Sequence, residues 1–219
     1  MDRLRADRYG AVLFDLDGTL LDSARLITIA FEDTVRAHLR AEVDRAEAMR
    51  TWSLPIRDRF RLLAPGRDEF LARAYVRRYL ALHDRYAHLF PGVADVLETL
   101  RVRGYVMGIV TSKRRATTQA AVSAFRLDRW CAVVITEEDI PRPKPDPAPV
   151  RTAAARLGVP LGRALMVGDS PVDIVAGRNA GAGTAAALWG TLEAKSLLAE
   201  APHHRLDRPE DLLTICPAA

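Results

Sequence analysis

Two aspartates lie two residues apart near the start of the chain, in the segment LFDLDGTLLDS at positions 13–23. Asp15 ends the apolar run AVLFD and is therefore expected at the carboxyl end of a strand, where open α/β sheets bind their ligands. Asp17 precedes Gly18 and Thr19, which indicate that the chain is already turning. Both carboxylates can thus face one crevice, although an Asx turn that merely ends a strand would explain the same residues.

Two further segments place polar groups after a strand or before a helix. In VTSK, Thr111 and Ser112 end an apolar run, and Lys113 is expected to open the next helix, whose N-terminus could bind a phosphate oxygen. In RPKPDP, prolines flank Lys144 and fix the backbone ahead of a helix that begins near Pro147. Each pattern alone is more often a helix cap or a solvated lysine.

The segment VGDSPVD combines helix-start chemistry with one carboxylate that the helix does not need. Ser170 is a typical N-cap, Pro171 suits the first helical position, and Asp173 favours the helix dipole. Asp169 precedes this cap. Together with Asp15 it offers the hard oxygen ligands that Mg²⁺ prefers, with water and a substrate phosphate completing the shell. Four such segments at strand ends form a set of groups for phosphoryl transfer, and their joint occurrence is hard to explain by capping alone.

The elements that must position these residues follow an alternating pattern. Short apolar runs are each followed by a helical pattern, which predicts an α/β fold with a doubly wound parallel sheet. The expected strands are AVLFD (11–15), YVMGIVT (105–111), AVVIT (132–136), ALMVGD (164–169) and TAAALW (184–189).

One interval breaks the alternation. Residues 22–88 are rich in Ala, Arg and Leu at helical spacing and contain no convincing strand, so they predict an inserted α-helical cap. The first cap helix is expected to start at Asp22 or Ser23 as N-cap, and the longest helix to cover FLARAYVRRYLALHDRYAHL. The catalytic core would then comprise residues 1–21 and 89–219.

Composition excludes several other classes of protein. The chain has 219 residues, 27% of them charged, and a net charge of +4 from dispersed arginines, with only 6% aromatic residues, so we expect no nucleic-acid partner. No apolar run approaches the roughly 20 residues of a membrane span, and the charged start MDRLRADRYG does not resemble a signal peptide, which predicts a cytoplasmic protein without a membrane partner. Cys131 and Cys216 are expected to be reduced thiols, and His203 and His204 to be surface or packing residues.

The sequence resembles the haloacid dehalogenase (HAD) superfamily of phosphatases through FDLDGT, TSK, the lysine of KPDP and GDSPVD. This resemblance covers nearly the whole chain and implies a HAD-like, Rossmannoid core with the five strands in the order 5-4-1-2-3. The stretches VVITEEDIPRPKPDPAPV, VGDSPVDIVAGRNAG and LDRPEDLLTI are most similar to phosphoglycolate phosphatases and to the pyrophosphatase that acts beside the HPr kinase/phosphorylase.

The resemblance implies roles for particular residues. Asp15 would be the nucleophile, forming an aspartyl-phosphate, and Asp17 the general acid and base. Thr111 and Lys144 would neutralise the transferred phosphoryl group, and Mg²⁺ would be held by Asp15, Asp169 and the backbone carbonyl of Asp17. The supporting residues would be Gly18, Thr19, Ser112 and Asp173, the last of which would orient Asp169, a metal-bound water or Lys144.

Departures from relatives separate the competing functions. Asp17 argues against a dehalogenase or a phosphonatase, which lack a carboxylate there. Ile27 stands about where β-phosphoglucomutases carry a histidine, so a phosphosugar mutase is less favoured, and a non-catalytic phosphate-binding protein of the same fold would be expected to have lost Asp15, Asp17 or Lys144. Ser53 replaces a glycine of many relatives in the cap turn.

The expected substrate is a small, highly charged phosphate compound, with pyrophosphate and 2-phosphoglycolate ahead of sugar phosphates and nucleotides. Guanidinium groups around the cap turns would bind its second anionic group. The candidates are Arg50, Arg57, Arg59, Arg61 and Arg67, of which more than half are expected to be solvated, and the sequence singles out none of them.

Overall fold

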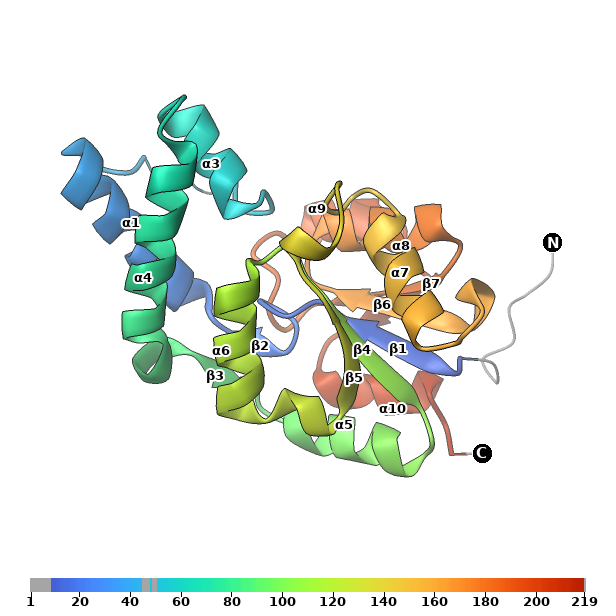
Figure 1. Ribbon diagram of the computed structural model, residues 1–219. Helices are drawn as coiled ribbons and strands as arrows, with labels where there is room; N and C mark the ends of the chain where they lie inside the picture. Colours follow the sequence, from blue (N-terminus) through green and yellow to red (C-terminus); the bar gives the residue numbers. More distant parts are fainter. Residues whose placement is uncertain (1–8, 45–47, 49–50, 219) are drawn as a thin grey trace.

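The structure is a computed structural model that describes residues 9–44, 48 and 51–218; the charged segment 1–8 and Arg50 lie outside the described residues. Its centre is a six-stranded parallel sheet in the order β5-β4-β1-β6-β7-β8 (Figure 1). The strands are β1 (Ala11–Phe14), β4 (Val106–Val110), β5 (Cys131–Ile135), β6 (Ala164–Gly168), β7 (Gly183–Ala187) and β8 (His204–Leu206). The five expected strands and their expected order are confirmed.

The sixth strand, β8, was not expected from the sequence. It has three residues and pairs with β7 at the sheet edge, so it is too short to show a clear period. His204 of this strand bonds the Tyr9 hydroxyl at 2.9 Å, and the neighbouring His203 Nδ1 lies 2.8 Å from Thr184 Oγ1. Both histidines are therefore packing residues, as expected.

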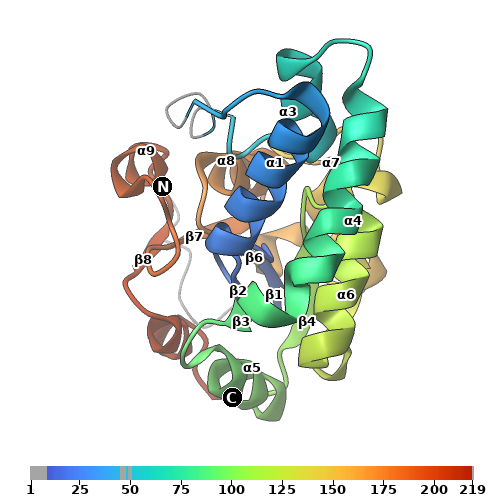
Figure 2. The ribbon, with the colours of Figure 1, turned by 90° about the vertical axis from the view of Figure 1, so that its left-hand side faces the viewer.

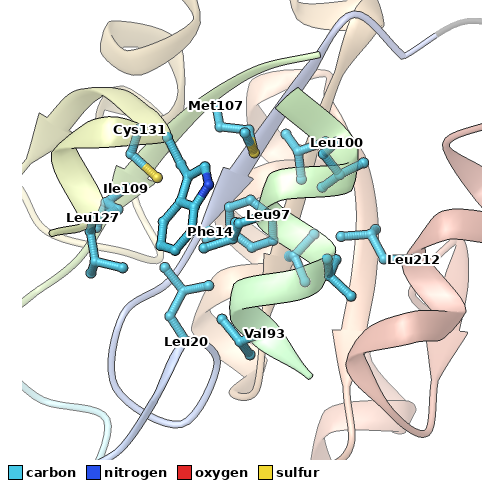
Figure 3. Packing of buried hydrophobic residues seen from close by; sticks show 14 of the residues in the cluster. Phe14, Leu20, Val93, Leu97, Leu100, Met107, Ile109, Leu127, Cys131 and Leu212 are labelled. Atoms are coloured by element: carbon cyan, nitrogen blue, oxygen red, sulfur yellow. The ribbon is translucent and has the colours of Figure 1, made fainter. Parts of the chain in front are cut away.

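Helices cover both faces of the sheet because side chains of β1 alternate between two apolar clusters. Val12 and Phe14 pack on the face covered by α5 (Val93–Val102) and α10 (Leu212–Ile215), in one buried cluster that includes Leu97, Leu100, Met107 and Leu212 (Figure 3). Ala11 and Leu13 pack on the opposite face, against α7 (Ala148–Arg156) and α8 (Pro171–Ala180). The remaining core helices are α6 (Arg115–Phe125) and α9 (Ala194–Ala199), with 3₁₀ helices at Leu127–Arg129, Glu137–Asp139, Leu161–Arg163 and Pro209–Asp211.

A separate group of helices lies beyond the carboxyl ends of the strands (Figure 1). It consists of α1 (Ala24–Leu39), α3 (Ile56–Leu63) and α4 (Asp68–Tyr86) and has a hydrophobic cluster of its own around Phe31, Phe60 and Tyr79. Figure 2 shows α4 between α1 and α6, so this helical region rests on the core along α6. An all-helical insert was expected here.

The longest helix ends earlier than the sequence suggested. It stops at Tyr86, and His88–Leu89 forms β3, which pairs antiparallel with β2 (Leu21–Asp22). The two chain connections to the helical region are thus tied to each other, at the positions where the boundary between core and cap is predicted. Strands of two residues are too short to show the alternation of apolar and polar residues by which a strand is predicted from sequence.

Two further expectations concern solvent and membrane. Cys131 and Cys216 are unpaired and buried, and burial raises the pKa of each thiol to about 12, which makes both unreactive. No helix in the described part of the chain has the length and apolar character that crossing a bilayer requires.

Candidate active site

The loop after β1 brings Asp15 and Asp169 together. The backbone N–H of Asp15 donates to the carbonyl of Val167 at 2.9 Å, which continues the pairing of β1 with β6 beyond the strand end. Gly18 has a φ of 80°, and a Cβ there would lie 2.2 Å from Asp169 Oδ2. Glycine is therefore required both by the left-handed backbone and by the close approach of the carboxylate. Thr19 is fully buried and donates to Asp169 Oδ1 at 3.1 Å.

Lys144 occupies the centre of this group of carboxylates. Its Nζ donates to Asp15 Oδ1 at 2.7 Å, to Asp173 Oδ1 at 2.5 Å and to the carbonyl of Val110 at 2.9 Å. All three protons of the ammonium group are therefore engaged. Burial would lower the pKa of Lys144, but Asp15 and Asp173 outweigh it and hold the pKa above its usual value. The group is a fixed cation beside Asp15 rather than a solvated surface lysine.

Asp173 serves the helix and the site at once. Its Oδ2 accepts from the backbone N–H and the hydroxyl of Ser170 and so completes a capping box at the start of α8, while its Oδ1 binds Lys144. Of the three partners suggested for Asp173, Lys144 is the one that its side chain contacts in the structure.

The acidic groups outnumber the cation that neutralises them. Asp15, Asp169 and Asp173 each offer an oxygen within 4.8 Å of the others, and Lys144 is the ammonium that contacts this cluster. Burial raises the pKa of Asp15 to about 7. Lys144 opposes this increase, and the negative charge of Asp173 adds to it. Burial and then the charge of Asp15 raise the pKa of Asp169 well above its usual value. When all three carboxylates are ionised, the one ammonium leaves two negative charges, which one divalent cation would balance.

Thr111 and Ser112 follow β4 and line the same crevice. Thr111 is 5% exposed, and its hydroxyl oxygen accepts from the backbone N–H of Lys113 at 3.2 Å, which leaves its proton free to donate. Ser112 Oγ is buried and has no hydrogen-bond partner among the described residues. A buried hydroxyl without a partner is uncommon, and this one can donate to a molecule bound in the crevice.

The sequence suggested that Lys113 opens a helix. In the structure it precedes the helix, and its side chain binds Asp17. The helix α6 begins at Arg115, and Lys113 Nζ lies 2.7 Å from Asp17 Oδ1 and 2.8 Å from Oδ2. The same ammonium donates to the hydroxyl of Tyr79 on α4 at 2.6 Å. Ser23 makes no side-chain cap to α1; its hydroxyl donates to Asp17 Oδ1 at 2.5 Å instead. The Asp17 carboxylate is therefore bound separately from the acidic cluster of Asp15, Asp169 and Asp173, which could hold a metal ion.

The sequence analysis missed both Lys113 and Ser23 as partners of Asp17. Each was assigned to helix capping because it stands just before a helical pattern. The signal that could have found Lys113 is its place directly after the two hydroxyl residues at a strand end, where side chains converge on the crevice.

A cavity of about 110 Å³ opens in front of these groups, several times the space that one ordered water needs by the same measure. Asp15, Thr111, Ser112, Lys144 and Asp169 line it from the core. From the helical region it is lined by Ile27, Trp52, Ser53, Leu54, Ile56, Arg59 and Tyr75, which include the expected cap turn. The structure thus brings the predicted catalytic residues and the turn around Ser53 to one small cavity.

Comparison with known proteins agrees with this fold and site. Residues 12–187 match the model of the haloacid dehalogenase-like hydrolase family. The chain is 34% identical over 208 residues to pyrophosphatase PpaX of Bacillus velezensis, covering 95% of this chain and 96% of that protein. A structure from Lactobacillus plantarum, named as a candidate phosphoglycolate phosphatase, superposes with a TM-score of 0.86 at 28% identity and covers 95% of this chain and 99% of its own.

CbbY of Rhodobacter sphaeroides, solved with phosphate, has a TM-score of 0.83 at 24% identity, covers 93% of this chain and 96% of its own, and shows the shared fold alone. The sheet order, the loop after β1 and the residues around Lys144 define a hydrolase with a Rossmann-like core. The chain belongs to the haloacid dehalogenase-like hydrolase family. At the level of enzyme class, the prediction of a hydrolase of phosphate ester or anhydride bonds is confirmed.

Proposed function

We propose that this hydrolase is a Mg²⁺-dependent phosphatase in which Asp15 attacks phosphorus, and that its substrate is pyrophosphate or 2-phosphoglycolate. The observation that carries the proposal is the position of Asp15: it lies at the end of β1, beside Lys144 and Asp169, at the wall of a cavity. A nucleophilic carboxylate must reach the substrate and must keep its charge. Lys144 serves the second requirement.

The reaction takes place in two displacements. A carboxylate oxygen of Asp15 forms a bond to phosphorus while the bond from phosphorus to the leaving oxygen breaks, which gives an aspartyl-phosphate. Water then attacks the same phosphorus, the Asp15 oxygen leaves with its electron pair, and inorganic phosphate is released. Lys144 stays within hydrogen-bond distance of Asp15 in both steps and stabilises the charge that returns to it.

Asp17 is the proposed proton carrier for both displacements. It would donate a proton to the leaving oxygen in the first and accept one from the attacking water in the second. Asp15 cannot do this while it is covalently occupied. Support comes from the anchoring of the Asp17 carboxylate by Ser23 and Lys113 at the cavity wall, two residues from the nucleophile.

The residues present fit a divalent cation. Asp15 and Asp169 offer hard oxygen ligands, and the cluster has the two uncompensated negative charges described above. Both oxygens of Asp173 are already engaged, by Lys144 and by Ser170, so Asp15 and Asp169, with the backbone carbonyl of Asp17, would hold Mg²⁺. When bound, Mg²⁺ would neutralise charge on the transferred phosphoryl group.

Thr111 and Ser112 would bind the non-bridging oxygens of that group. Thr111 has a hydroxyl proton that the described contacts leave free, and the Ser112 hydroxyl has no partner at all among the described residues. Gly18 and Thr19 shape the loop around Asp169 and would act through it.

Residues 22–88 would form a cap over the core of residues 1–21 and 89–219. The cavity has walls from both parts, and Arg114 at the start of α6 binds Glu69 of α4 at 3.2 Å across their contact. Such a cap excludes water during the first displacement and limits the site to compact substrates. A cytoplasmic location stays a prediction.

Pyrophosphate is placed slightly ahead of 2-phosphoglycolate because the 34% identity to the Bacillus velezensis pyrophosphatase extends over 95% of the chain. A phosphosugar mutase remains the alternative, and the cavity weighs against it. Ile27 lies in the wall at the place considered for a mutase histidine, and no histidine is found among the described residues that line the cavity.

The test is a substrate panel with purified protein, with Mg²⁺ and after chelation. The panel contains pyrophosphate, 2-phosphoglycolate, a hexose phosphate, a nucleoside monophosphate and phenyl phosphate, and the Asp15→Asn variant is the blank. We expect Mg²⁺-dependent phosphate release with the highest kcat/KM on one of the first two compounds. A higher kcat/KM on the hexose phosphate or the nucleotide would refute the substrate assignment, and no release from any compound would refute the phosphatase.

A further inference from the structure

Arg59 is a buried cation that pairs with no carboxylate of the described residues. It lies on α3 and is 4% exposed, its Nε has no hydrogen-bond partner, and it takes part in no ion pair with another described residue. Burial lowers the pKa of this guanidinium, which nevertheless stays charged at neutral pH. A buried charge without a partner destabilises a protein, so a function that needs the charge would explain why it is kept.

Neighbouring arginines of the same helix are different. Arg57 binds Asp68 at 2.8 Å with a side chain that is 45% exposed, and Arg61 binds Asp58 at 2.6 Å with a side chain that is 52% exposed. Both are solvated ion pairs of the kind expected for most cap arginines. Arg67 donates to the backbone carbonyl of His38 on the surface of the helical region.

The position of Arg59 is fixed by aromatic packing. Its guanidinium carbon lies 4.1 Å from the centre of the Phe31 ring and 5.5 Å from that of Trp52. Phe31 in turn stacks on Phe60 with ring centres 5.0 Å apart. Ring faces hold a cation without satisfying its N–H donors, so the hydrogen-bonding capacity of the group is kept for another partner.

Arg59 also shares a cavity with Asp15. The described cationic side chains that line this cavity are Arg59, Lys113, Arg114 and Lys144. Lys144 is bound to Asp15 and Asp173, Lys113 to Asp17, and Arg114 to Glu69 and Glu138. Within this set, Arg59 alone has no carboxylate partner among the described residues.

From this arrangement, and resting on the proposed phosphatase function, we infer that Arg59 binds the second anionic group of the substrate, the one that is not transferred to Asp15. A planar guanidinium can bind either a phosphate or a carboxylate through two N–H donors. The shared requirement is thus an anion on the leaving group, supplied as phosphate by pyrophosphate and as carboxylate by 2-phosphoglycolate. Arg59 would select such substrates against phosphate monoesters with a neutral leaving group.

The experiment compares kcat/KM of the wild type, Arg59→Gln and Arg59→Lys on pyrophosphate, 2-phosphoglycolate and phenyl phosphate. In Arg59→Gln we expect kcat/KM for the better of pyrophosphate and 2-phosphoglycolate to fall on the order of 10- to 100-fold, the loss typical of one charged hydrogen-bonding group. The value for phenyl phosphate should change less than about 3-fold, because its leaving group carries no charge for Arg59 to bind. Arg59→Lys keeps the charge but not the two-donor geometry and should lie between wild type and Gln.

The matched control is Arg57→Gln, because Arg57 lies on the same helix but is paired with Asp68. This variant should leave kcat/KM on all three compounds unchanged. Equal losses of kcat/KM on phenyl phosphate and on the two compounds with a second anionic group would overturn the inference, as would unchanged values on all three. Failure of the wild type on every compound would instead refute the proposed function, so the two failures are distinguishable.

A second measurement separates binding from a structural role. Arg59→Met keeps the aliphatic length and removes the buried charge, so the melting temperature of the free protein should stay the same or rise. Binding of the non-hydrolysable analogue imidodiphosphate, followed by calorimetry with Mg²⁺ present, should weaken on the order of 10-fold or more. A melting temperature lowered by several degrees with unchanged imidodiphosphate affinity would show that Arg59 is structural and would overturn the inference.

Discussion

Lys113 lies with its ammonium nitrogen 2.7 Å and 2.8 Å from the two carboxylate oxygens of Asp17, although 96 residues separate them in the chain. The same nitrogen donates to Tyr79 of α4 at 2.6 Å and lies 4.2 Å from the centre of that ring. The proposed proton carrier is therefore connected through one side chain to the helical region. Movement of α4 relative to the core would change the surroundings of Asp17.

Replacing Lys113 should impair catalysis through this contact. In Lys113→Met the Asp17 carboxylate loses its ion pair, and we expect kcat to fall on the order of 10- to 100-fold, less than the ~10²- to 10⁴-fold contribution of the acid–base group itself. Tyr79→Phe keeps the ring below the ammonium and should lose less, and Lys195→Met, at an exposed position of α9, is the control. An unchanged kcat in Lys113→Met would contradict a role for this contact in proton transfer.

Replacing the nucleophile should abolish turnover and leave the fold intact. The Asp15→Asn side chain is nearly isosteric but cannot attack phosphorus, so kcat should fall by more than ~10³-fold, as expected when a chemical participant is removed. Circular dichroism and the melting curve should show a folded protein. Asp128→Asn, at an exposed position of the 3₁₀ helix Leu127–Arg129, is the matched control and should keep full activity. Substantial turnover by the folded Asn variant would refute the covalent mechanism.

Metal exchange should distinguish a catalytic ion from a general charge effect. Chelation should abolish activity, Mg²⁺ should restore it, and Ca²⁺ should restore little, because its larger and looser coordination misplaces the nucleophile relative to phosphorus. The measurement is phosphate release against metal concentration for each ion. Full activity after exhaustive chelation would rule out the metal assignment.

The stability of the metal-free protein should depend on pH in a direction set by Asp15 and Asp169. Burial raises the pKa of Asp15 to about 7 and that of Asp169 well above its usual value, so the folded state holds protons that the unfolded chain releases at roughly pH 4. The contribution of these groups to the free energy of unfolding therefore falls as the pH rises from about 5 through 7. Bound Mg²⁺ would pair with the ionised carboxylates and remove this penalty.

Thermal melting with and without saturating Mg²⁺ at pH 6 and pH 8 tests this directly. The increase in melting temperature caused by Mg²⁺ should be larger at pH 8, where protons compete less for the carboxylates and like charges repel one another more strongly in the metal-free site. Asp15→Asn should reduce the increase at both pH values. A larger increase at pH 6 would show that the site does not bind the ion through these carboxylates.

The core and most residues of the candidate site could be predicted from the sequence. The carboxyl ends of parallel strands meet at one edge of a sheet, so Asp15, Thr111 and Asp169 could be assigned to one crevice from their places at the ends of apolar runs. Lys144 was assigned from the proline-flanked segment RPKPDP and from the family resemblance. Elements of two or three residues, namely β2, β3 and β8, were missed because they are too short to carry a period.

The tertiary structure decided which charges are paired. Lys113 stands where a helix start was expected, and its bond to Asp17 depends on a distance across 96 residues that no local pattern contains. The cap arginines differ in burial and in their carboxylate neighbours, and both follow from the packing of α3 against α1 and α4. Arg59 differs from the other arginines because it is buried without a carboxylate partner among the described residues, at the wall of the cavity that Asp15 also lines.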